Sequence, residues 1–206
     1  MKLRTRAKAR VLIFQSSTSF VIGHWTPVIS DLYTRHMQIQ LSGPMKKEMT
    51  PAIMSRIERA LQEFPEFNGQ TITIGLNRAT GLHGSALARE MRIRLNPRRR
   101  AGVTYFTIGH ELTHLLQKPG LGVVPYGEEQ CDIWTLARSE LFLDDLPTYL
   151  CAHFWDKKNW SAHSAAVRAL CVQAIEVRKT NRRYKIWLEQ AIQSYIHRRA
   201  IGAVRA

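Results

Sequence analysis

The sequence lacks any long apolar run, any internal repeat, any glycine-rich phosphate loop and any serine or cysteine nucleophile motif. No apolar stretch approaches the roughly 20 residues that a helix needs to cross a bilayer, so a membrane-spanning anchor is not expected. The missing motifs argue against phosphate-loop nucleotide hydrolysis and against covalent hydrolysis at a serine or cysteine. The length of 206 residues suits one domain, or a compact core with an appended segment.

Cysteine is scarce and shows no pairing pattern. The chain has three cysteines, Cys131, Cys151 and Cys171, which are widely spaced and fall in predicted helices. An odd number at such spacing favours reduced thiols in a cytoplasmic protein over a disulfide framework.

Acidic residues are scarce near the start of the chain, where the first is Asp31, whereas Lys2, Arg4, Arg6, Lys8 and Arg10 form a basic arm. The whole chain has 30 Lys and Arg against 16 Asp and Glu, a formal net charge of +14. Such an excess points to an acidic partner, such as nucleic acid or an anionic surface. The alternating basic residues do not form a helical face, and the apolar run at 11–14 is too short for a secretory signal. We therefore interpret the arm as part of the mature protein.

The segment 104–117 (TYFTIGHELTHLLQ) predicts a buried metal-binding helix. His110 and His114 are four residues apart, so their imidazoles project from one face of an α-helix. Glu111 lies about 100° around the helix from His110, and it could reach a water at the metal without being a ligand. That is the geometry of a general base. Thr104 can cap the start of the helix.

A third ligand is needed because catalytic zinc usually takes three protein ligands and leaves one position open. The segment 127–132 (GEEQCD) offers Glu128 and Asp132, four residues apart on one face of the next predicted helix. Glu128 is predicted to bind zinc, and Asp132 to accept a hydrogen bond from a ligand histidine and so fix its tautomer. We expect Cys131 to be a small buried side chain rather than a ligand.

At these residues the chain resembles the gluzincin metallopeptidases, whose signature is HExxH followed by a glutamate on a later helix. It is most similar to the ImmA/IrrE group, which typically shows a strand ending in Asn, a Phe-containing lead into a HELGH-like helix, and an E-x-E-A-N-like helix. Segments 92–96 (RIRLN), 105–109 (YFTIG) and 128–132 (EEQCD) occupy those places.

The resemblance covers residues 51 to 145 and departs from the group's pattern at three places. Thr113 stands where Gly is usual, Cys131 and Asp132 replace Ala-Asn, and the sequence after Leu141 lacks the usual LLMP-like ending. The resemblance implies a zincin fold, and it implies a repressor-like protein as the target.

The predicted fold is α+β: a small twisted sheet and a packing helix, two zinc-bearing helices, and a carboxy-terminal helical hairpin. Strands are expected at 71–76 and 91–95, with a third, edge strand within 81–88. In zincins such an edge strand pairs with an extended substrate peptide. Segments 10–14 and 37–41 could be strands, and 27–36 a short helix.

Several helices are predicted from caps and apolar stripes. After a break at 42–44, a helix capped by Thr50 should run to Phe64 and pack on the sheet. The glutamate helix should continue to Leu141, and two basic helices beginning near Ser161 and Tyr184 should form the hairpin. Three parts follow: a basic segment 1–45, a zinc metallopeptidase core 46–156 and a basic hairpin 157–206.

Other residues have competing interpretations. A short helical segment starting at Pro147 would carry Tyr149 and His153, either of which could donate a hydrogen bond to the oxyanion of a tetrahedral intermediate, as could His163. His83 is expected to be an ordinary surface histidine. For the run at 98–100 (RRR), a solvated turn and a site for phosphate or acidic side chains at the cleft rim both remain open.

The function predicted from these patterns is zinc-dependent hydrolysis of a protein or peptide substrate, with Glu111 as the base and no membrane partner. One alternative is a DNA-associated protease similar in role to the SprT-like group, with the basic arm and hairpin holding nucleic acid. Another is a nucleic-acid-binding or interaction protein with a non-catalytic zinc site. The glutamate at 111 argues against the last, because a structural site has no use for a base.

Overall fold

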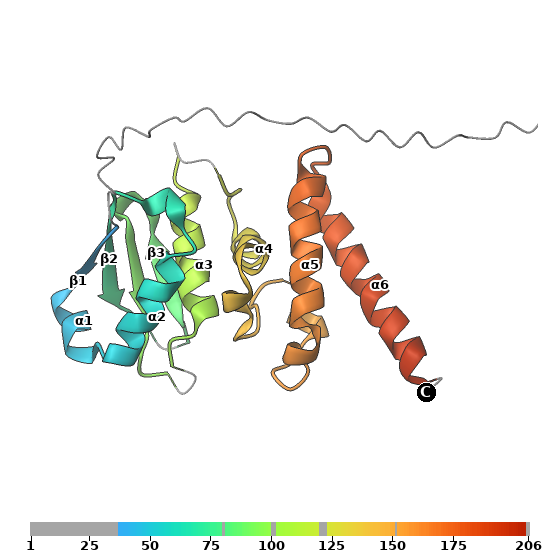
Figure 1. Cartoon of the computed structure of the whole chain (residues 1–206), viewed down its shortest axis with the longest axis horizontal. Helices are drawn as coiled ribbons and strands as arrows, with labels where there is room; N and C mark the ends of the chain where they lie inside the picture. The colour runs from blue at the N-terminus through green and yellow to red at the C-terminus, as the bar shows by residue number, and fades with distance from the viewer. Residues whose placement is uncertain (1–36, 80, 100–101, 120–122, 151, 205–206) are drawn as a thin grey trace, which may run out of the picture. The chain divides into compact units, whose positions relative to one another are not determined.

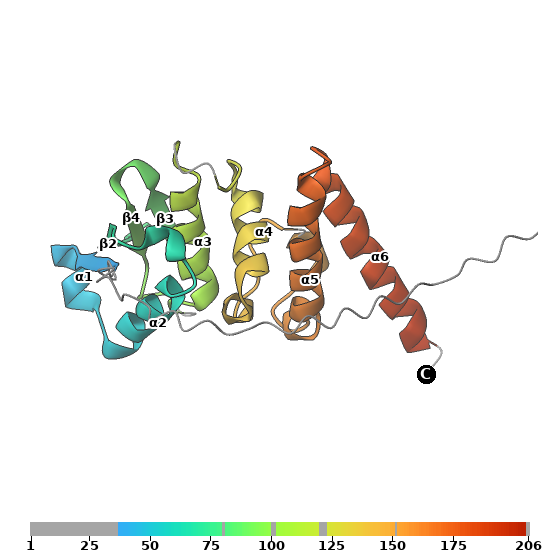
Figure 2. The ribbon, with the colours of Figure 1, turned by 45° about the horizontal axis from the view of Figure 1, so that its top comes forward.

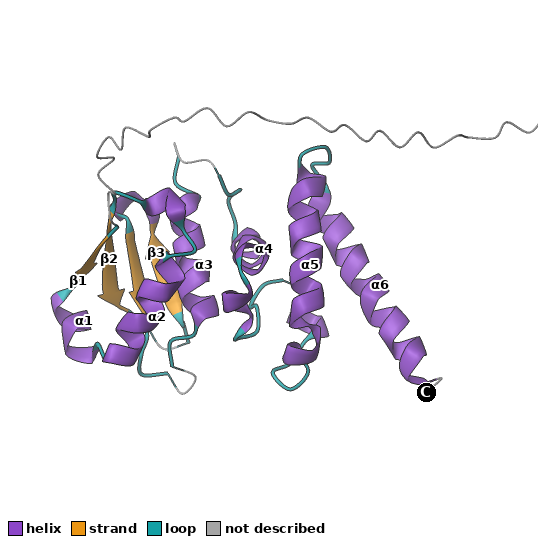
Figure 3. Cartoon of the chain, viewed as in Figure 1, coloured by secondary structure: helices purple, strands orange, loops and turns teal. Residues whose placement is uncertain are grey.

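The structure is a computed structural model that describes residues 37–204, apart from 80, 100–101, 120–122 and 151. The strand expected at 10–14, the helix expected at 27–36 and the basic arm lie outside the described residues. Residues 34–206 belong to one compact unit. Within its described part, this unit is an α+β fold of four strands and six α-helices, shown by type in Figure 3.

The sheet is mixed, with the strand order β1-β2-β4-β3. Strands β1 (Gln38–Leu41), β2 (Thr71–Leu76) and β4 (Arg92–Leu95) run parallel, and β3 (Gly84–Leu87) pairs antiparallel with β4 at one edge. Isoleucines and leucines at alternate positions of β2 and β4 are buried, as a sheet with one face on the core requires. The edge strand predicted within 81–88 is confirmed.

Two α-helices lie between β1 and β2. Helix α1 (Gly43–Glu48) lies where the sequence predicts a break at Ser42-Gly43-Pro44. The break was wrong: the Ser42 hydroxyl caps the helix by accepting from the Met45 amide, and proline is compatible with a first turn. Helix α2 (Pro51–Leu61) is capped by Thr50 as expected, ends before Phe64 and packs against α3.

Helix α3 (Tyr105–Leu116) carries the HExxH motif and lies between the sheet and α4 (Glu128–Arg138), as Figures 1 and 2 show. The Thr104 hydroxyl caps α3 by accepting from the Thr107 amide at 3.1 Å. The Asp144 carboxylate accepts from two further first-turn amides, at 2.8 Å each. The helix is held firmly at the end that precedes His110.

Helix α4 does not continue to Leu141, as the apolar spacing had suggested. It ends at Arg138, because Ser139 has an extended backbone and its hydroxyl accepts from the Leu141 amide at the start of a 3-10 helix, Glu140–Leu143. This turn brings Asp144 back to the start of α3.

The predicted hairpin is confirmed. Helix α5 (Trp160–Arg178) packs against both α4 and α6 (Tyr184–Val204). A hydrophobic cluster joins the hairpin to α3 and α4. It includes Phe106 of α3, Ile133 and Leu136 of α4, Val167 of α5 and Leu188 of α6. No helix in the described part of the chain has both the length and the apolar character needed to span a bilayer.

Candidate metal centre

Three side chains from α3 and α4 converge on one point. The Nε2 atoms of His110 and His114 are 3.2 Å apart, and Oε2 of Glu128 lies 3.1 Å from the first and 3.0 Å from the second. Ligand atoms around a tetrahedral zinc ion with bonds of about 2.0–2.1 Å would be about 3.3 Å apart. These three residues, which the sequence predicted as ligands, form a group that could hold a metal ion.

A hydrogen bond at the other ring nitrogen of His110 fixes the orientation of the ring. Its Nδ1 atom lies 2.8 Å from Oδ1 of the fully buried Asp132, and a carboxylate can only accept, so Nδ1 carries a proton. The other Asp132 oxygen accepts from the backbone amides of Tyr149 and Leu150, at 2.6 Å and 2.8 Å. Asp132 therefore holds His110 as predicted, and it also holds the loop that carries Tyr149.

The side-chain amide of Gln117, which the sequence did not predict, orients His114 in a similar way. The Gln117 side-chain nitrogen donates to the carbonyls of Pro125 and Gly127, at 2.6 Å and 3.0 Å. Its oxygen must therefore face His114 Nδ1, 3.0 Å away, and accept that proton. Gln117 thus directs His114 Nε2 at the metal point and ties down the residue before Glu128.

The electrostatics of the three-residue group favour a cation. Burial alone would lower the pKa of His110, but hydrogen bonds with Asp132 and Glu128 raise it to about 10. The hydrogen bond with His110 is the main cause that lowers the pKa of Glu128 to about 2, although partial burial opposes it. These side chains therefore stabilise a positive charge at the point between them, either a proton or a metal ion.

Cys131 lies on the far side of His114. Its thiol is fully buried and 3.2 Å from His114 Nδ1, whereas the metal point faces Nε2. Burial raises the pKa of this thiol, so it stays protonated. The position agrees with the expected small buried side chain and gives no support to a ligand role.

We expect Gln117→Ala to lower zinc affinity by about 10- to 100-fold, the usual effect of losing a partner that orients a metal ligand. Gln117→Glu should also lose affinity, because its carboxylate can accept from His114 Nδ1 but cannot donate to the Pro125 and Gly127 carbonyls. Competition with a zinc-binding dye measures both, with the exposed Gln190→Ala on α6 as the control. Equal affinity for Gln117→Ala and wild type would remove Gln117 from the metal centre.

Helix α3 packs tightly against its neighbours at Gly109. A Cβ atom at Gly109 would lie 2.7–2.8 Å from the Phe142 ring and 2.8 Å from the Thr135 methyl group, so glycine is required there. One turn later, the buried Thr113 hydroxyl bonds to Thr135 across the helix pair and to the Gly109 carbonyl, both at 2.8 Å. Thr113, the departure from the HELGH pattern, thus links α3 to α4 and helps set the spacing of the ligands.

Glu111 lies beside the ligands but is not one of them. Its side chain is buried, and Oε2 has no hydrogen-bond partner among the described residues. Burial raises the pKa of Glu111 to about 7, with His110 lowering it and Glu128 raising it. A carboxylate whose pKa is near neutrality is suited to accepting and returning a proton.

The edge strand touches this carboxylate. A Cβ atom at Gly84, the first residue of β3, would lie 2.5 Å from Glu111 Oε1 and 2.7 Å from its Cγ. The sequence did not predict this contact, although glycine inside a strand often marks a close approach. An extended chain paired with β3 would pass directly beside Glu111.

Gly84→Ala should therefore displace the Glu111 carboxylate while leaving the metal ligands in place. For the hydrolysis that the sequence predicts, we expect the rate to fall about 100-fold, the effect of misplacing a catalytic group by about 1 Å, with an unchanged zinc content. Gly43→Ala is the control, because a Cβ atom at this exposed position would meet nothing within 4 Å. Steady-state rates with elemental analysis test this, and a rate within twofold of wild type would contradict the close approach.

A cleft of about 1060 Å³ contains the metal point. Residues 81–90, which include β3, form one wall of the cleft. Helix α3 forms another wall, and residues 145–149 form the third. Tyr149 lines this cleft, 47% exposed, with its ring centroid 5.8 Å from that of His110. Burial and then the nearby carboxylates raise the pKa of Tyr149, so its hydroxyl keeps a proton to donate. Of the oxyanion candidates, Tyr149 is the one that the structure brings to the cleft.

The other two candidates lie elsewhere. His153 is in a 3-10 helix, Ala152–Phe154, with its ring against Phe154, and His163 of α5 is 3.1 Å from the Tyr195 hydroxyl; neither lines the cleft. The helical segment expected from Pro147 is not formed at 147–150, because Asp132 takes the amides there. Tyr149 and His153 are therefore not on one helix.

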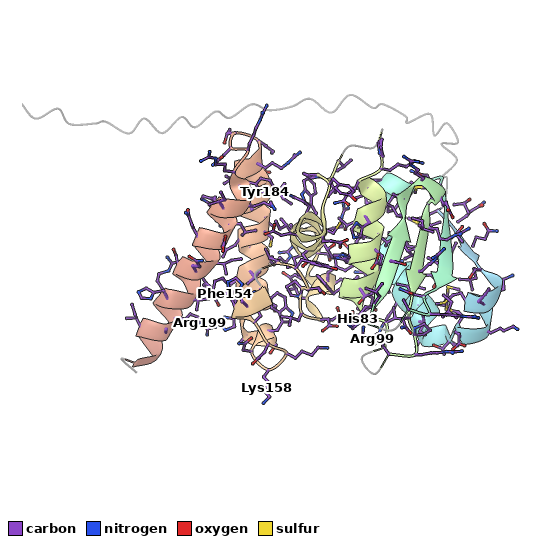
Figure 4. The ribbon with its side chains drawn as sticks, turned by 180° about the vertical axis from the view of Figure 1, so that it is seen from behind. His83, Arg99, Phe154, Lys158, Tyr184 and Arg199 are labelled. Carbon is purple, nitrogen blue, oxygen red and sulfur yellow. The ribbon has the colours of Figure 1, made fainter. Side chains whose placement is uncertain are left out.

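His83 and the arginine run differ from the simplest expectations. His83 is half-buried and lines the cleft, and burial lowers its pKa. Figure 4 shows it close to Arg99. It is not an ordinary surface residue, and it does not join the three-residue metal group. Arg99 donates to the Gly81 carbonyl at 2.6 Å, and Arg98 pairs with Glu48. These two arginines tie the loop down, and Arg100 lies outside the described residues.

Comparison of the chain with protein-family models, with curated proteins and with solved structures finds no match in any of the three.

Proposed function

We propose that the protein is a zinc-dependent metallopeptidase of the gluzincin type. The observation that carries the proposal is the convergence of two Nε2 atoms and one carboxylate oxygen within 3.2 Å of one another, beside a buried carboxylate that is not a ligand. Two imidazoles and a carboxylate form the donor set that catalytic zinc takes in peptidases. A site for structure alone would gain nothing from Glu111.

His110, His114 and Glu128 would hold the ion. Zinc supplies Lewis-acid chemistry to such a site, where it increases the acidity of water and the electrophilicity of a carbonyl group. Glu111 would accept a proton from water and return it to the leaving amine. Tyr149 would donate its hydroxyl proton in a hydrogen bond to the developing oxyanion.

The position of the substrate follows from β3. The strand pairs with β4 on one side, and its other edge borders the cleft, so an extended peptide could add to it through backbone hydrogen bonds. Because Gly84 touches Glu111, the scissile bond would cross the cleft at that residue. Such binding reads the peptide backbone, which agrees with a protein or peptide substrate.

Incubation with a peptide library, followed by mass spectrometry of the new termini, tests this proposal. The zinc-loaded protein should cleave, a chelator should stop cleavage, and added zinc should restore it. A zinc-loaded protein that cleaves no peptide in a diverse library would refute the proposal.

A further inference from the structure

Positive charge is concentrated away from the metal centre. Residues 37–156 contain 13 Lys and Arg and 13 Asp and Glu, so they carry no net formal charge. Residues 157–206 contain 11 Lys and Arg against Glu176 and Glu189. The excess charge of the hairpin therefore does not serve to balance acids within the hairpin.

The cations gather first at the turn between α5 and α6. We define the turn cluster as five exposed residues within eight positions: Arg178, Lys179, Arg182, Arg183 and Lys185. Three of these have neighbours, because Lys179 pairs with Glu176, Lys185 with Glu129, and Arg178 lies 6.0 Å from the Trp134 ring centroid. The described residues give the Arg182 and Arg183 side chains no partner, so both remain free for a ligand.

A second group of exposed cations lies at the opposite end of the hairpin: Lys157, Lys158, Arg198 and Arg199. Figure 4 shows Lys158 at one end of the helix pair and Tyr184, next to the turn cluster, at the other. The 19 residues of α5 rise about 28 Å, so the two groups are about 30 Å apart. That separation is close to one turn of a nucleic-acid duplex, about 34 Å. The spacing suits an extended polyanion better than a single phosphate group.

We propose that the hairpin binds the phosphate backbone of nucleic acid, with the turn cluster as the main contact. An anionic membrane would also attract cations, but a helix that lies on a membrane inserts an apolar face. The large hydrophobic side chains that the described part of α5 and α6 exposes are Val172, Ile186 and Ile201, with exposures of 40%, 52% and 43%, and these are scattered. Nucleic acid is therefore the partner that fits, and this surface does not depend on the metal centre.

Fluorescence anisotropy with a labelled 20-base-pair duplex and a 20-nucleotide single strand tests the proposal on the full zinc-loaded chain. The wild type should bind at least one of them more tightly than about 10⁻⁴ M at physiological salt, with affinity that falls steeply as salt rises. The double variant Arg182→Ala/Arg183→Ala should bind roughly 10- to 30-fold more weakly, and its slope of log affinity against log salt should be smaller by about 2.

The double variant Lys46→Ala/Lys47→Ala is the matched control, because it removes the same charge from two exposed, adjacent residues of α1 in the neutral part of the chain. Its affinity should stay within about twofold of wild type, and all proteins should keep their zinc content and melting temperature. Equal losses in both double variants would overturn the turn cluster as the contact. Affinities weaker than about 10⁻⁴ M for both oligonucleotides would overturn nucleic acid as the partner, whether or not the protein binds phosphatidylserine vesicles.

Discussion

Glu111→Gln is expected to keep its zinc and to lose nearly all hydrolysis. The amide has the same shape as the carboxylate and can still bond to water, but it cannot accept a proton. Glu111 is buried beside the ligands and is not one of the three atoms at the metal point. Losing a general base at such a position typically lowers the rate by about 10²- to 10⁴-fold.

Elemental analysis and rates of peptide hydrolysis on the same preparations measure both halves of this expectation. Glu189→Gln, at an exposed position of α6, controls for the loss of one carboxylate. A loss of zinc in Glu111→Gln would place residue 111 among the ligands. A rate equal to that of wild type would show that another group takes the proton.

Glu128→Ala should weaken zinc binding far more than Glu129→Ala. Glu128 supplies an oxygen 3.0–3.1 Å from both histidine nitrogens, whereas the Glu129 carboxylate turns away and pairs with Lys185 of α6. Loss of a ligand should exceed the about 10- to 100-fold effect of losing an orienting partner. The Glu129 variant should lose only an exposed ion pair, which contributes about 0–1 kcal/mol to stability.

Zinc dissociation constants from competition titration compare the two variants directly. Circular dichroism of both shows whether α4 still forms, since each change affects its first turn. A greater loss of affinity in Glu129→Ala would move the third ligand by one residue and would require a different start for α4.

The parts of the metal centre that follow from local spacing could be predicted from the sequence. His110, His114 and Glu111 take their relative positions from one helix, and the 3.6-residue repeat fixes that geometry once the helix is expected. Glu128 and Asp132 follow in the same way on α4. The caps Thr104 and Thr50, and the alternation in β2, are equally local.

The supporting residues could not be predicted because they act across long stretches of chain. Asp144 caps α3 from 38 and 39 residues away, and Gln117 reaches the carbonyls before Glu128 through a loop. Gly84 meets Glu111 because β3 lies beside α3. Such contacts depend on the packed fold, and no periodic pattern of residues in the sequence indicates them.

The oxyanion candidates show the same limit. Tyr149 and His153 could not be ranked from the sequence, because both follow Pro147 in one predicted helical segment and both side chains can donate a hydrogen bond. The structure separates them because the Asp132 carboxylate accepts from the Tyr149 and Leu150 amides and so holds this loop beside His110, whereas His153 lies against Phe154. The same buried acid thus positions one ligand and one side chain of the cleft.

X-ray absorption at the zinc K-edge of the purified, zinc-loaded protein tests the proposed centre most directly. We expect one zinc per chain, with nitrogen and oxygen neighbours at about 2.0–2.2 Å, two of them imidazoles, and no sulfur neighbour. Glu128→Ala should lose one of the oxygen neighbours. A sulfur neighbour at about 2.3 Å, or a wild-type spectrum without imidazole scattering, would contradict a centre built from His110, His114 and Glu128.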